Sequence, residues 1–211
     1  GATNTAIGFS ALLNNTTASN NTAVGHRAAY SSTASGITAI GAYTLENNST
    51  GAGNTALGTW WSGVIEAALN ANTTGNRNTA IGCGSLKTNT TGSWNSGLGV
   101  ASLNSNTTGS YNVAIGDSAL NSNTTASNNN ALGYQALYSN QTGERNSAFG
   151  RAALYTNTNS DNSAFGHASL QDNTSGTANT AVGTSALQSN TTASNNTAVG
   201  YQAGYALSLI H

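Results

Sequence analysis

The sequence predicts an all-β protein built as a β-solenoid, a parallel β-roll of about twelve coils with about 17 residues in each. Three observations lead to this prediction. A motif of the type Asn-Thr-Ala-Val-Gly, seen at 196–200, recurs twelve times at nearly constant spacing. The side chains around each copy alternate in size, as a strand requires, and the segments between copies are rich in Asn, Thr, Ser and Gly. A unit of this length is too short for helix-pair repeats, which need about 33 residues or more.

Each copy of the motif closes with a glycine, and consecutive closing glycines lie 16 or 17 residues apart, except for one step of 24. The coils end at Gly8, Gly25, Gly41, Gly58, Gly82, Gly99, Gly116, Gly133, Gly150, Gly166, Gly183 and Gly200. We therefore treat 1–211 as a single repeat domain with a seven-residue insertion within 59–67. Low-complexity disorder is the alternative for so polar a chain, but a disordered linker has no reason to keep large apolar residues at a fixed phase.

The residue before each closing glycine, here called the anchor, is large and apolar in every coil. The anchors are Ile7, Val24, Ile40, Leu57, Ile81, Leu98, Ile115, Leu132, Phe149, Phe165, Val182 and Val199. A second apolar position, usually Leu, follows five residues later, as at Leu120. Strand alternation places the anchor and the Thr two residues before it on one face, which we expect to be buried. The Ala before the anchor then lies on a small-residue face that packs within the chain or against another chain, and a second short strand carries the Leu.

The segment after the second apolar position, of the type Asn-Thr-Thr-Gly-Ser, has turn chemistry, because Asn bonds to nearby backbone and Gly tolerates positive φ. Stacked coils lie about 4.8 Å apart, so twelve of them predict a rod on the order of 55–60 Å long. An Asn stands three residues before the anchor in eleven coils. We expect aligned Asn side chains to hydrogen-bond along the stack, as they do in cross-β ladders. The ends carry no polar cap, which predicts either a longer chain or stacking on other subunits.

The segments 130–140 and 196–203 resemble the shaft repeats of phage tail-fibre-like and bacterial surface-fibre proteins. They are also similar to the head repeats of trimeric autotransporter adhesins, in which a shorter Asn-Ser-x-Ala-Ile-Gly unit forms a left-handed parallel β-roll and three rolls assemble side by side. The resemblance covers nearly the whole chain, although the unit here is longer. It implies an extracellular, virion-surface or cell-surface location, a fibrous or adhesive role, and a homo-oligomer.

Composition excludes several other classes of partner. Charged residues are 5% of the chain, against about 25% in a typical soluble protein, and the net charge is −1. We therefore expect no nucleic-acid footprint and no basic membrane-binding helix. No apolar run approaches the roughly 20 residues of a membrane-spanning helix, so no membrane insertion is expected. Cys83 is the only cysteine, which rules out a disulfide framework within the chain.

We find no catalytic constellation, so the protein is predicted not to be an enzyme and to need no cofactor. Of the six acids, only Glu144 and Asp161 fall at similar phases in adjacent coils, and both are interpreted as solvated turn residues rather than a glycosidase pair. The spacing of His26, His167 and His211 matches no metal-ligand pattern, so no metal site is expected.

Two groups of residues are candidates for surface contact. Trp60 and Trp61 lie in the insertion, which forms either an aromatic contact loop for a glycan or a neighbouring chain, or a loop folded back onto the rod. Tyr134, Arg151 and His167 stand two residues after the anchor in three consecutive coils. They form either an exposed stripe able to stack on sugars or ordinary surface decoration.

Nearly every turn also contains an Asn-x-Thr/Ser sequence, the acceptor pattern for N-glycosylation in a secreted chain. The alternative is turn chemistry that happens to spell the acceptor. The candidate acceptors are Asn15, Asn48, Asn72, Asn89, Asn106, Asn123, Asn140, Asn173 and Asn190.

The leading functional hypothesis is a structural or adhesive extracellular fibre or filament subunit whose partner is itself, as a trimer or an end-to-end filament, with a cell-surface glycan as a further partner. An ice-binding solenoid is the alternative, since Thr recurs two residues before the anchor, as at Thr5 and Thr22. That column is interrupted at Ser96, and we expect it to share the buried face of the anchors. A glycan-binding or glycan-degrading tailspike segment is the third class, and the missing acid pair argues against degradation.

Overall fold

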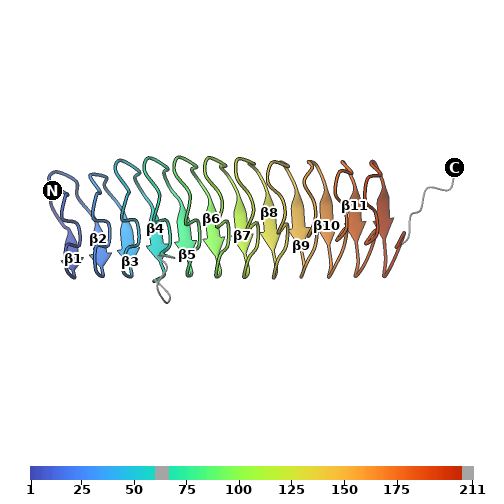
Figure 1. Ribbon diagram of the computed structural model, residues 1–211, viewed down its shortest axis with the longest axis horizontal. Coiled ribbons are helices and arrows are strands. Elements are labelled where there is room, and N and C mark those ends of the chain that lie inside the picture. The colour runs from blue at the N-terminus through green and yellow to red at the C-terminus, as the bar shows by residue number, and fades with distance from the viewer. Residues whose placement is uncertain (60–66, 206–211) are drawn as a thin grey trace.

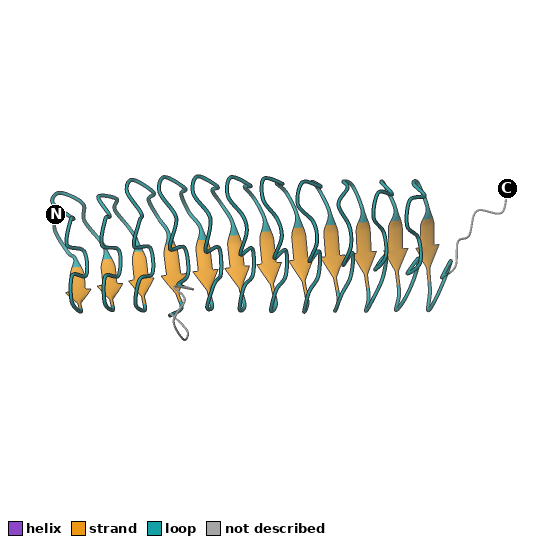
Figure 2. Ribbon diagram, in the orientation of Figure 1, coloured by secondary structure: helices purple, strands orange, loops and turns teal. Residues whose placement is uncertain are grey.

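The computed structural model describes residues 1–59 and 67–205, and over these it is a rod of stacked coils (Figure 1). Each coil contributes one three-residue strand, and the remainder of the described chain is turn and loop (Figure 2). The strands are β1 (Thr5–Ile7), β2 (Thr22–Val24), β3 (Thr38–Ile40), β4 (Thr55–Leu57), β5 (Thr79–Ile81), β6 (Ser96–Leu98), β7 (Val113–Ile115), β8 (Asn130–Leu132), β9 (Ser147–Phe149), β10 (Ser163–Phe165), β11 (Thr180–Val182) and β12 (Thr197–Val199).

The twelve strands form one parallel sheet in chain order, from β1 to β12. The pairing is in register throughout, so that Ala114 of β7 lies beside Ala131 of β8 and Ile115 lies beside Leu132. Every position of the repeat therefore forms a column that runs the length of the rod. The prediction of an all-β solenoid with one motif per coil is confirmed.

The second strand predicted around the Ala-Leu pair is wrong, because the described segments there are turns. Ser118 and Leu120 have φ values of 56° and 50°, a left-handed conformation that a strand does not contain. The amide of Leu120 still donates to the carbonyl of Ala136 in the next coil at 3.0 Å, so the backbone ladder continues without a strand. These left-handed residues bend the chain sharply enough to close a coil in 17 residues, and they direct the leucine into the interior, where Leu120 is fully buried.

The prediction that the anchors lie on the buried face of the strand is also wrong. Thr and the anchor do share one face of the strand, but that face points outward, and the Ala between them is buried. The interior beside the strand has room for only a methyl group. At Gly97, the one coil without this Ala, an added Cβ would lie 2.5 Å from the Oγ of Ser85 and 3.0 Å from the Oγ of Ser102. A side chain the size of Ile does not fit there, so the large residues occupy the outer face.

The core is consequently narrow and uniform. It consists of the column of strand alanines, a facing column that is mostly alanine, and the leucine column, all packed together along the rod. Two columns of buried asparagine fill the remainder of the cross-section. The predicted ladder three residues before the anchor is confirmed, since the Oδ1 of Asn95 accepts from the backbone amide of Asn112 at 3.0 Å and from its Nδ2 at 3.2 Å. The turn asparagines form a second ladder, in which the Nδ2 of Asn106 donates to the Oδ1 of Asn89 at 2.8 Å and each neighbouring coil repeats the bond.

The closing glycine allows the coils to approach at the corner after each strand. Gly116 has a φ of 130°, and a Cβ at this position would lie 2.6 Å from the carbonyl oxygen of Gly133. Only glycine fits both the conformation and the space where another coil follows, and at Gly200 the φ of 130° alone favours it.

The insertion does not disturb the stacking. Thr55 of β4 and Thr79 of β5 pair in the same register as the strands of every other coil, although 24 residues separate them. Trp60 and Trp61, the aromatic contact residues predicted in this insertion, lie outside the described residues.

Candidate interaction surfaces

The most extensive surface feature is the outer face of the sheet, which we define as the anchor column together with the Thr column two residues before it. Eight of the anchors are between 38 and 70% exposed. They are Ile7, Ile40, Leu57, Leu98, Ile115, Phe165, Val182 and Val199. Phe149 and Phe165 stack with ring centroids 5.0 Å apart, so even the largest anchors lie in file along the rod.

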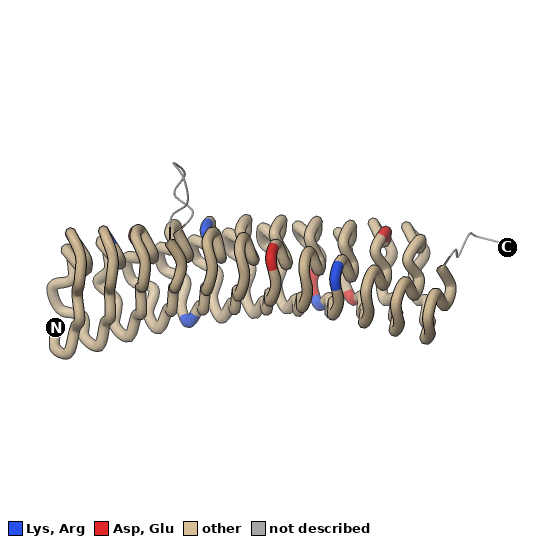
Figure 3. Tube along the Cα trace, turned by 90° about the horizontal axis from the view of Figure 1, so that it is seen from below, with Lys and Arg blue, Asp and Glu red and all other residues tan. Residues whose placement is uncertain are grey.

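This outer face carries no charge along its whole length. The position two before the anchor is Thr in seven coils and Ser, Val or Asn in the other five. The described charged side chains lie elsewhere on the rod, scattered over the turns (Figure 3). Removing water from an uncharged, apolar strip costs little free energy, because no charge has to be desolvated. Covering the strip with another surface is favourable, because it buries apolar area.

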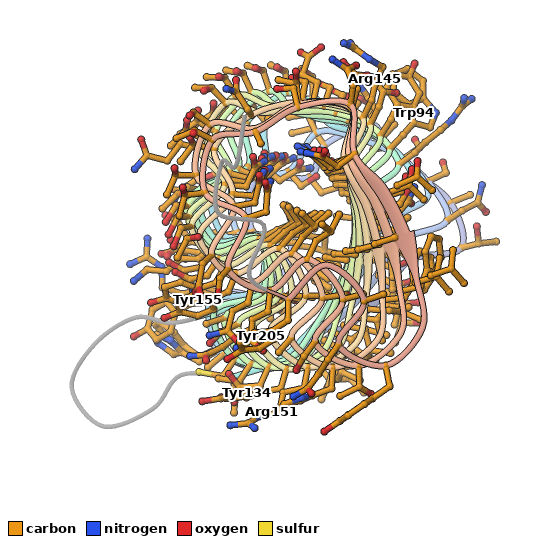
Figure 4. The ribbon with its side chains drawn as sticks, turned by 90° about the vertical axis from the view of Figure 1, so that its right-hand side faces the viewer. Trp94, Tyr134, Arg145, Arg151, Tyr155 and Tyr205 are labelled. Atoms are coloured by element: carbon orange, nitrogen blue, oxygen red, sulfur yellow. The ribbon has the colours of Figure 1, made fainter. Side chains whose placement is uncertain are left out.

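The predicted contact residues Tyr134, Arg151 and His167 do come together. Tyr134 and Arg151 lie at one corner of the cross-section (Figure 4). The guanidinium carbon of Arg151 lies 5.9 Å from the ring centroid of Tyr134, and its Nη1 lies 3.3 Å from the Nε2 of His167. With Gln135 and Gln171, the arginine and the histidine line a shallow hollow of about 320 Å³. The stripe is a physical cluster, and its role as a contact surface stays a prediction.

The asparagines proposed as glycosylation acceptors occupy a different place from the one expected. Asn15 is partly exposed, whereas the other eight are buried. The Nδ2 of Asn106 donates one hydrogen bond to Asn89 and a second to the carbonyl of Gly109 at 3.0 Å, so both amide hydrogens are used. A glycan on Nδ2 would displace one of these bonds and would have no space in the folded coil. The eight buried asparagines belong to the internal ladder, which favours the turn-chemistry interpretation for them, and glycosylation of Asn15 stays a prediction.

The one pair of acids at similar phases is held by a cation. Arg145 donates from Nε to the Oδ1 of Asp161 at 2.7 Å and from Nη2 to Oδ2 at 3.0 Å, and its Nη1 reaches the Oε2 of Glu144 at 3.1 Å. The hydrogen bond from Arg145, followed by its charge, lowers the pKa of Asp161. Both carboxylates therefore take part in an exposed ion-pair cluster.

The remaining titratable groups that the structure describes are dispersed. His26 stacks on Phe9 with ring centroids 5.5 Å apart and meets Tyr43 edge-on with centroids 5.0 Å apart. Among residues 1–59 and 67–205, no three His, Cys, Asp or Glu side chains gather closely enough to hold a metal ion.

Sequence reasoning missed a second surface cluster at the opposite edge of the outer face. Arg77, Trp94 and Tyr111 stand four residues before the anchor in three consecutive coils. Trp94 and Tyr111 stack with ring centroids 5.0 Å apart and planes 4° apart, and the guanidinium carbon of Arg77 lies 5.8 Å from the Trp94 ring. Comparing every phase of the repeat, rather than only the phases near the closing glycine, would have found this column.

No family model, no curated protein and no solved structure matches this chain. No helix in the described part of the chain is both long and apolar enough to cross a bilayer.

Proposed function

We propose that this protein is a structural, adhesive rod of an extracellular fibre, and that it associates with further copies of itself through the outer face of the sheet. One observation carries the proposal: the large apolar anchors lie in an unbroken column on the outside of the rod rather than in its core. A solvent-facing apolar column of this length is typical of an interface.

A second copy of the chain is the occupant that fits this face best. The anchors recur at the pitch of the coil, so only a partner with the same pitch can meet an anchor with an anchor, or a Thr with a Thr, in every coil. The absence of charge from both columns removes the repulsion that like charges would create between identical surfaces. Identical surfaces also favour closed symmetric assemblies of a few copies. The resemblance to fibre shafts and adhesin heads supports the extracellular location and the absence of catalysis in the proposal.

The test is the solution mass of the purified chain, measured by sedimentation equilibrium and by light scattering. We expect a small integer multiple of the chain mass of 21.1 kDa. The variant Leu98→Lys/Ile115→Lys places two charges on adjacent coils in the middle of the outer face, and we expect it to sediment as a single chain with unchanged circular dichroism.

The matched control is Thr108→Lys/Thr125→Lys, which places two charges on exposed turns of adjacent coils away from the outer face. We expect this control to keep the oligomeric mass. A wild-type chain that sediments at 21.1 kDa over a wide concentration range overturns the proposal. Equal dissociation of Leu98→Lys/Ile115→Lys and Thr108→Lys/Thr125→Lys also overturns the proposal, because the interface would then not be specific to the outer face.

Ice binding is a second candidate, favoured by one specific observation. The Thr column faces outward, so Thr5, Thr22 and the equivalent residues of β3, β4 and β5 form a regular row beside the anchors in five consecutive coils. The row is interrupted from Ser96 to Ser163, and the anchors differ in size, which makes the face less level than a regular Thr array.

A thermal-hysteresis measurement separates the two candidates. A fibre rod shows no hysteresis above that of a control protein at equal concentration. Hysteresis that Thr55→Lys/Thr79→Lys abolishes would support ice binding as the function of the outer face. In that case we expect both the wild-type chain and Leu98→Lys/Ile115→Lys to sediment as a single chain.

A further inference from the structure

The Arg77–Trp94–Tyr111 cluster borders a hollow that crosses three coils. The hollow has a volume of about 460 Å³ and is lined by Ala52, Gly53, Asn76, Arg77 and Trp94. It lies where the column four residues before the anchor changes from glycine, at Gly36 and Gly53, to the large side chains of Arg77, Trp94 and Tyr111. Three coils span about 10 Å of the rod, at about 4.8 Å a step. Trp94 lies at the corner of the cross-section that also carries Arg145, away from Tyr134 and Arg151 (Figure 4).

The large residues of this column adopt a backbone conformation that disfavours them. Arg77, Trp94 and Tyr111 have φ values of 54°, 57° and 61°, whereas Gly36 and Gly53 occupy the same position at 71° and 67°. A left-handed conformation costs a residue with a Cβ roughly 1–2 kcal/mol relative to glycine. The leucine column offsets such a cost by full burial, but Trp94 is 45% exposed and Tyr111 is 54% exposed. The same conformation recurs at the exposed Arg145 and Asp161 of this column, with φ values of 57° and 66°, so it belongs to the coil as a whole, and the exposed aromatic stack is what distinguishes the hollow.

The polar groups of the hollow are available to a ligand. Arg27 pairs with Glu46 and Arg145 pairs with Asp161, whereas no carboxylate of the described chain lies within 4 Å of the Arg77 guanidinium. The side chain of Asn76 is held in place, since its Oδ1 accepts from the amide of Ala52 at 2.9 Å and its Nδ2 donates to the carbonyl of Thr74 at 2.9 Å. Among the described residues, no further bond uses the second Nδ2 hydrogen, so it can donate to a ligand.

We propose that this hollow binds an acidic saccharide, a pyranose unit that bears a carboxylate. Arg77 pairs with the carboxylate, Asn76 donates to a ring hydroxyl, and the indole of Trp94 packs against the apolar face of the sugar. Tyr111 stacks on the far side of the indole and fixes its orientation. Nucleic acid does not suit the site, because a phosphate chain requires several cations and the hollow provides one. The proposal goes beyond self-association and concerns an edge of the outer face rather than the face itself.

The experiment uses the full chain with Trp60→Phe/Trp61→Phe, which leaves Trp94 as the sole indole because the chain has three tryptophans. Trp94 fluorescence is titrated with tri-galacturonate and with its carboxyl-reduced counterpart, tri-galactose. We expect a saturable change with the acid and at least tenfold weaker binding of the neutral sugar. Arg77→Gln is expected to weaken binding of the acid at least tenfold.

Gly53→Asn tests the hollow itself. Asn tolerates the left-handed backbone of Gly53. A Cβ at this position would lie 3.4 Å from the Cγ of Arg77, its nearest neighbour, and 4.0 Å from the Cα of Arg77. The substitution fills the hollow, and Asn already occupies this position of the repeat at Asn20, Asn128 and Asn195 with φ values of 61°, 63° and 62°. We expect it to weaken binding at least tenfold. Two matched controls, Gly36→Asn and Arg145→Gln, make the same changes in the same column outside the hollow and are expected to stay within twofold of the parent.

Three results would overturn the proposal. The first is a titration that does not saturate, and the second is equal binding by the parent and either Arg77→Gln or Gly53→Asn. The third is binding of a comparison ligand as tight as that of tri-galacturonate. Equal binding of tri-galactose would show that the carboxylate is not recognised, and equal binding of inorganic sulfate or tetraglutamate would show that the sugar is not recognised. Trp94 fluorescence reports saccharide binding at the hollow, and the sedimentation mass of each variant reports self-association. A failure of one proposal is therefore distinguishable from a failure of the other.

Discussion

The Nδ2 of Asn89 donates to the Oδ1 of Asn72 in the preceding coil at 2.8 Å, while its other hydrogen goes to the carbonyl of Gly92 at 2.9 Å. Asn89 is fully buried, and its own Oδ1 accepts from Asn106. One side chain thus closes its own turn and joins three coils. In a rod whose core is mostly alanine, this side-chain ladder adds to the backbone hydrogen bonds that join the coils along the axis.

We therefore expect Asn89→Ala to destabilise the rod by roughly 2–4 kcal/mol, because it leaves at least two buried groups unsatisfied at about 1–3 kcal/mol each. The measurement is the free energy of unfolding from a urea titration followed by circular dichroism. The control is Thr91→Ala, on the exposed part of the same turn, for which a change within about 0.5 kcal/mol is expected. Equal effects of the two substitutions would contradict the structural role of the ladder.

Gly97 and its neighbours offer a test of the interior packing. The hydroxyl groups of Ser85 and Ser102 lie 2.9 Å apart and fill the space that an alanine methyl occupies in the other coils. Gly97→Ala alone is expected to destabilise the chain by about 1–3 kcal/mol through overpacking. Combining it with Ser85→Ala and Ser102→Ala recreates the arrangement of the adjacent coils, so the triple variant should recover the wild-type unfolding midpoint. Additive losses in the triple variant would show that the three positions do not share one space.

The orientation of the strand is tested by substituting two neighbouring residues. Ala114 is fully buried and Ile115 is 38% exposed, although both belong to β7. Ala114→Val is expected to cost about 1–3 kcal/mol of stability because the interior has no room for two more methyl groups. Ile115→Ala is expected to cost roughly 1 kcal/mol or less in a single chain, since a partly exposed side chain loses little burial. Both free energies are measured on chains kept monomeric by dilution, and the reverse order would place the anchors inside.

The Arg145–Asp161 pair predicts a pH-dependent contribution to stability. The hydrogen bond from Arg145 lowers the pKa of Asp161 below its value in the unfolded chain, about 3.9. The pair therefore contributes fully above that pH, and its contribution is lost as the pH falls through the lower pKa of the folded state. The contribution is small, because both side chains are exposed and screened by solvent.

Carboxyl chemical shifts followed by NMR between pH 2 and pH 6 measure this directly. We expect the titration midpoint of Asp161 to rise in Arg145→Gln and also in 1 M salt, where the Debye length falls to about 3 Å. An unchanged midpoint in Arg145→Gln would mean that the ion pair does not form in solution.

Much of the architecture could be predicted from the repeat. A constant phase for Asn, Ala, the anchor and Gly implies identical coils, and identical coils stack in register, as Ala114 and Ala131 do. The candidate surfaces were predicted less completely. Tyr134, Arg151 and His167 were found because they share a phase, whereas Arg77, Trp94 and Tyr111 share a phase that was not compared, and the hollow beside them depends on a missing side chain at Gly53.

The repeat pattern alone predicts the solenoid, its pitch, the shared face of Thr and the anchor, and hydrogen bonding between aligned asparagines. Which face of the strand is buried depends on how the whole coil packs. An alternation of large and small residues has the same period in either orientation, so it cannot distinguish a buried anchor from an exposed one. The decision comes from the width of the coil: leucines in a left-handed conformation and buried asparagines fill its interior, and beside the strand they leave space for only a methyl group. For the same reason the apolar anchors lie on the surface, where another chain can cover them.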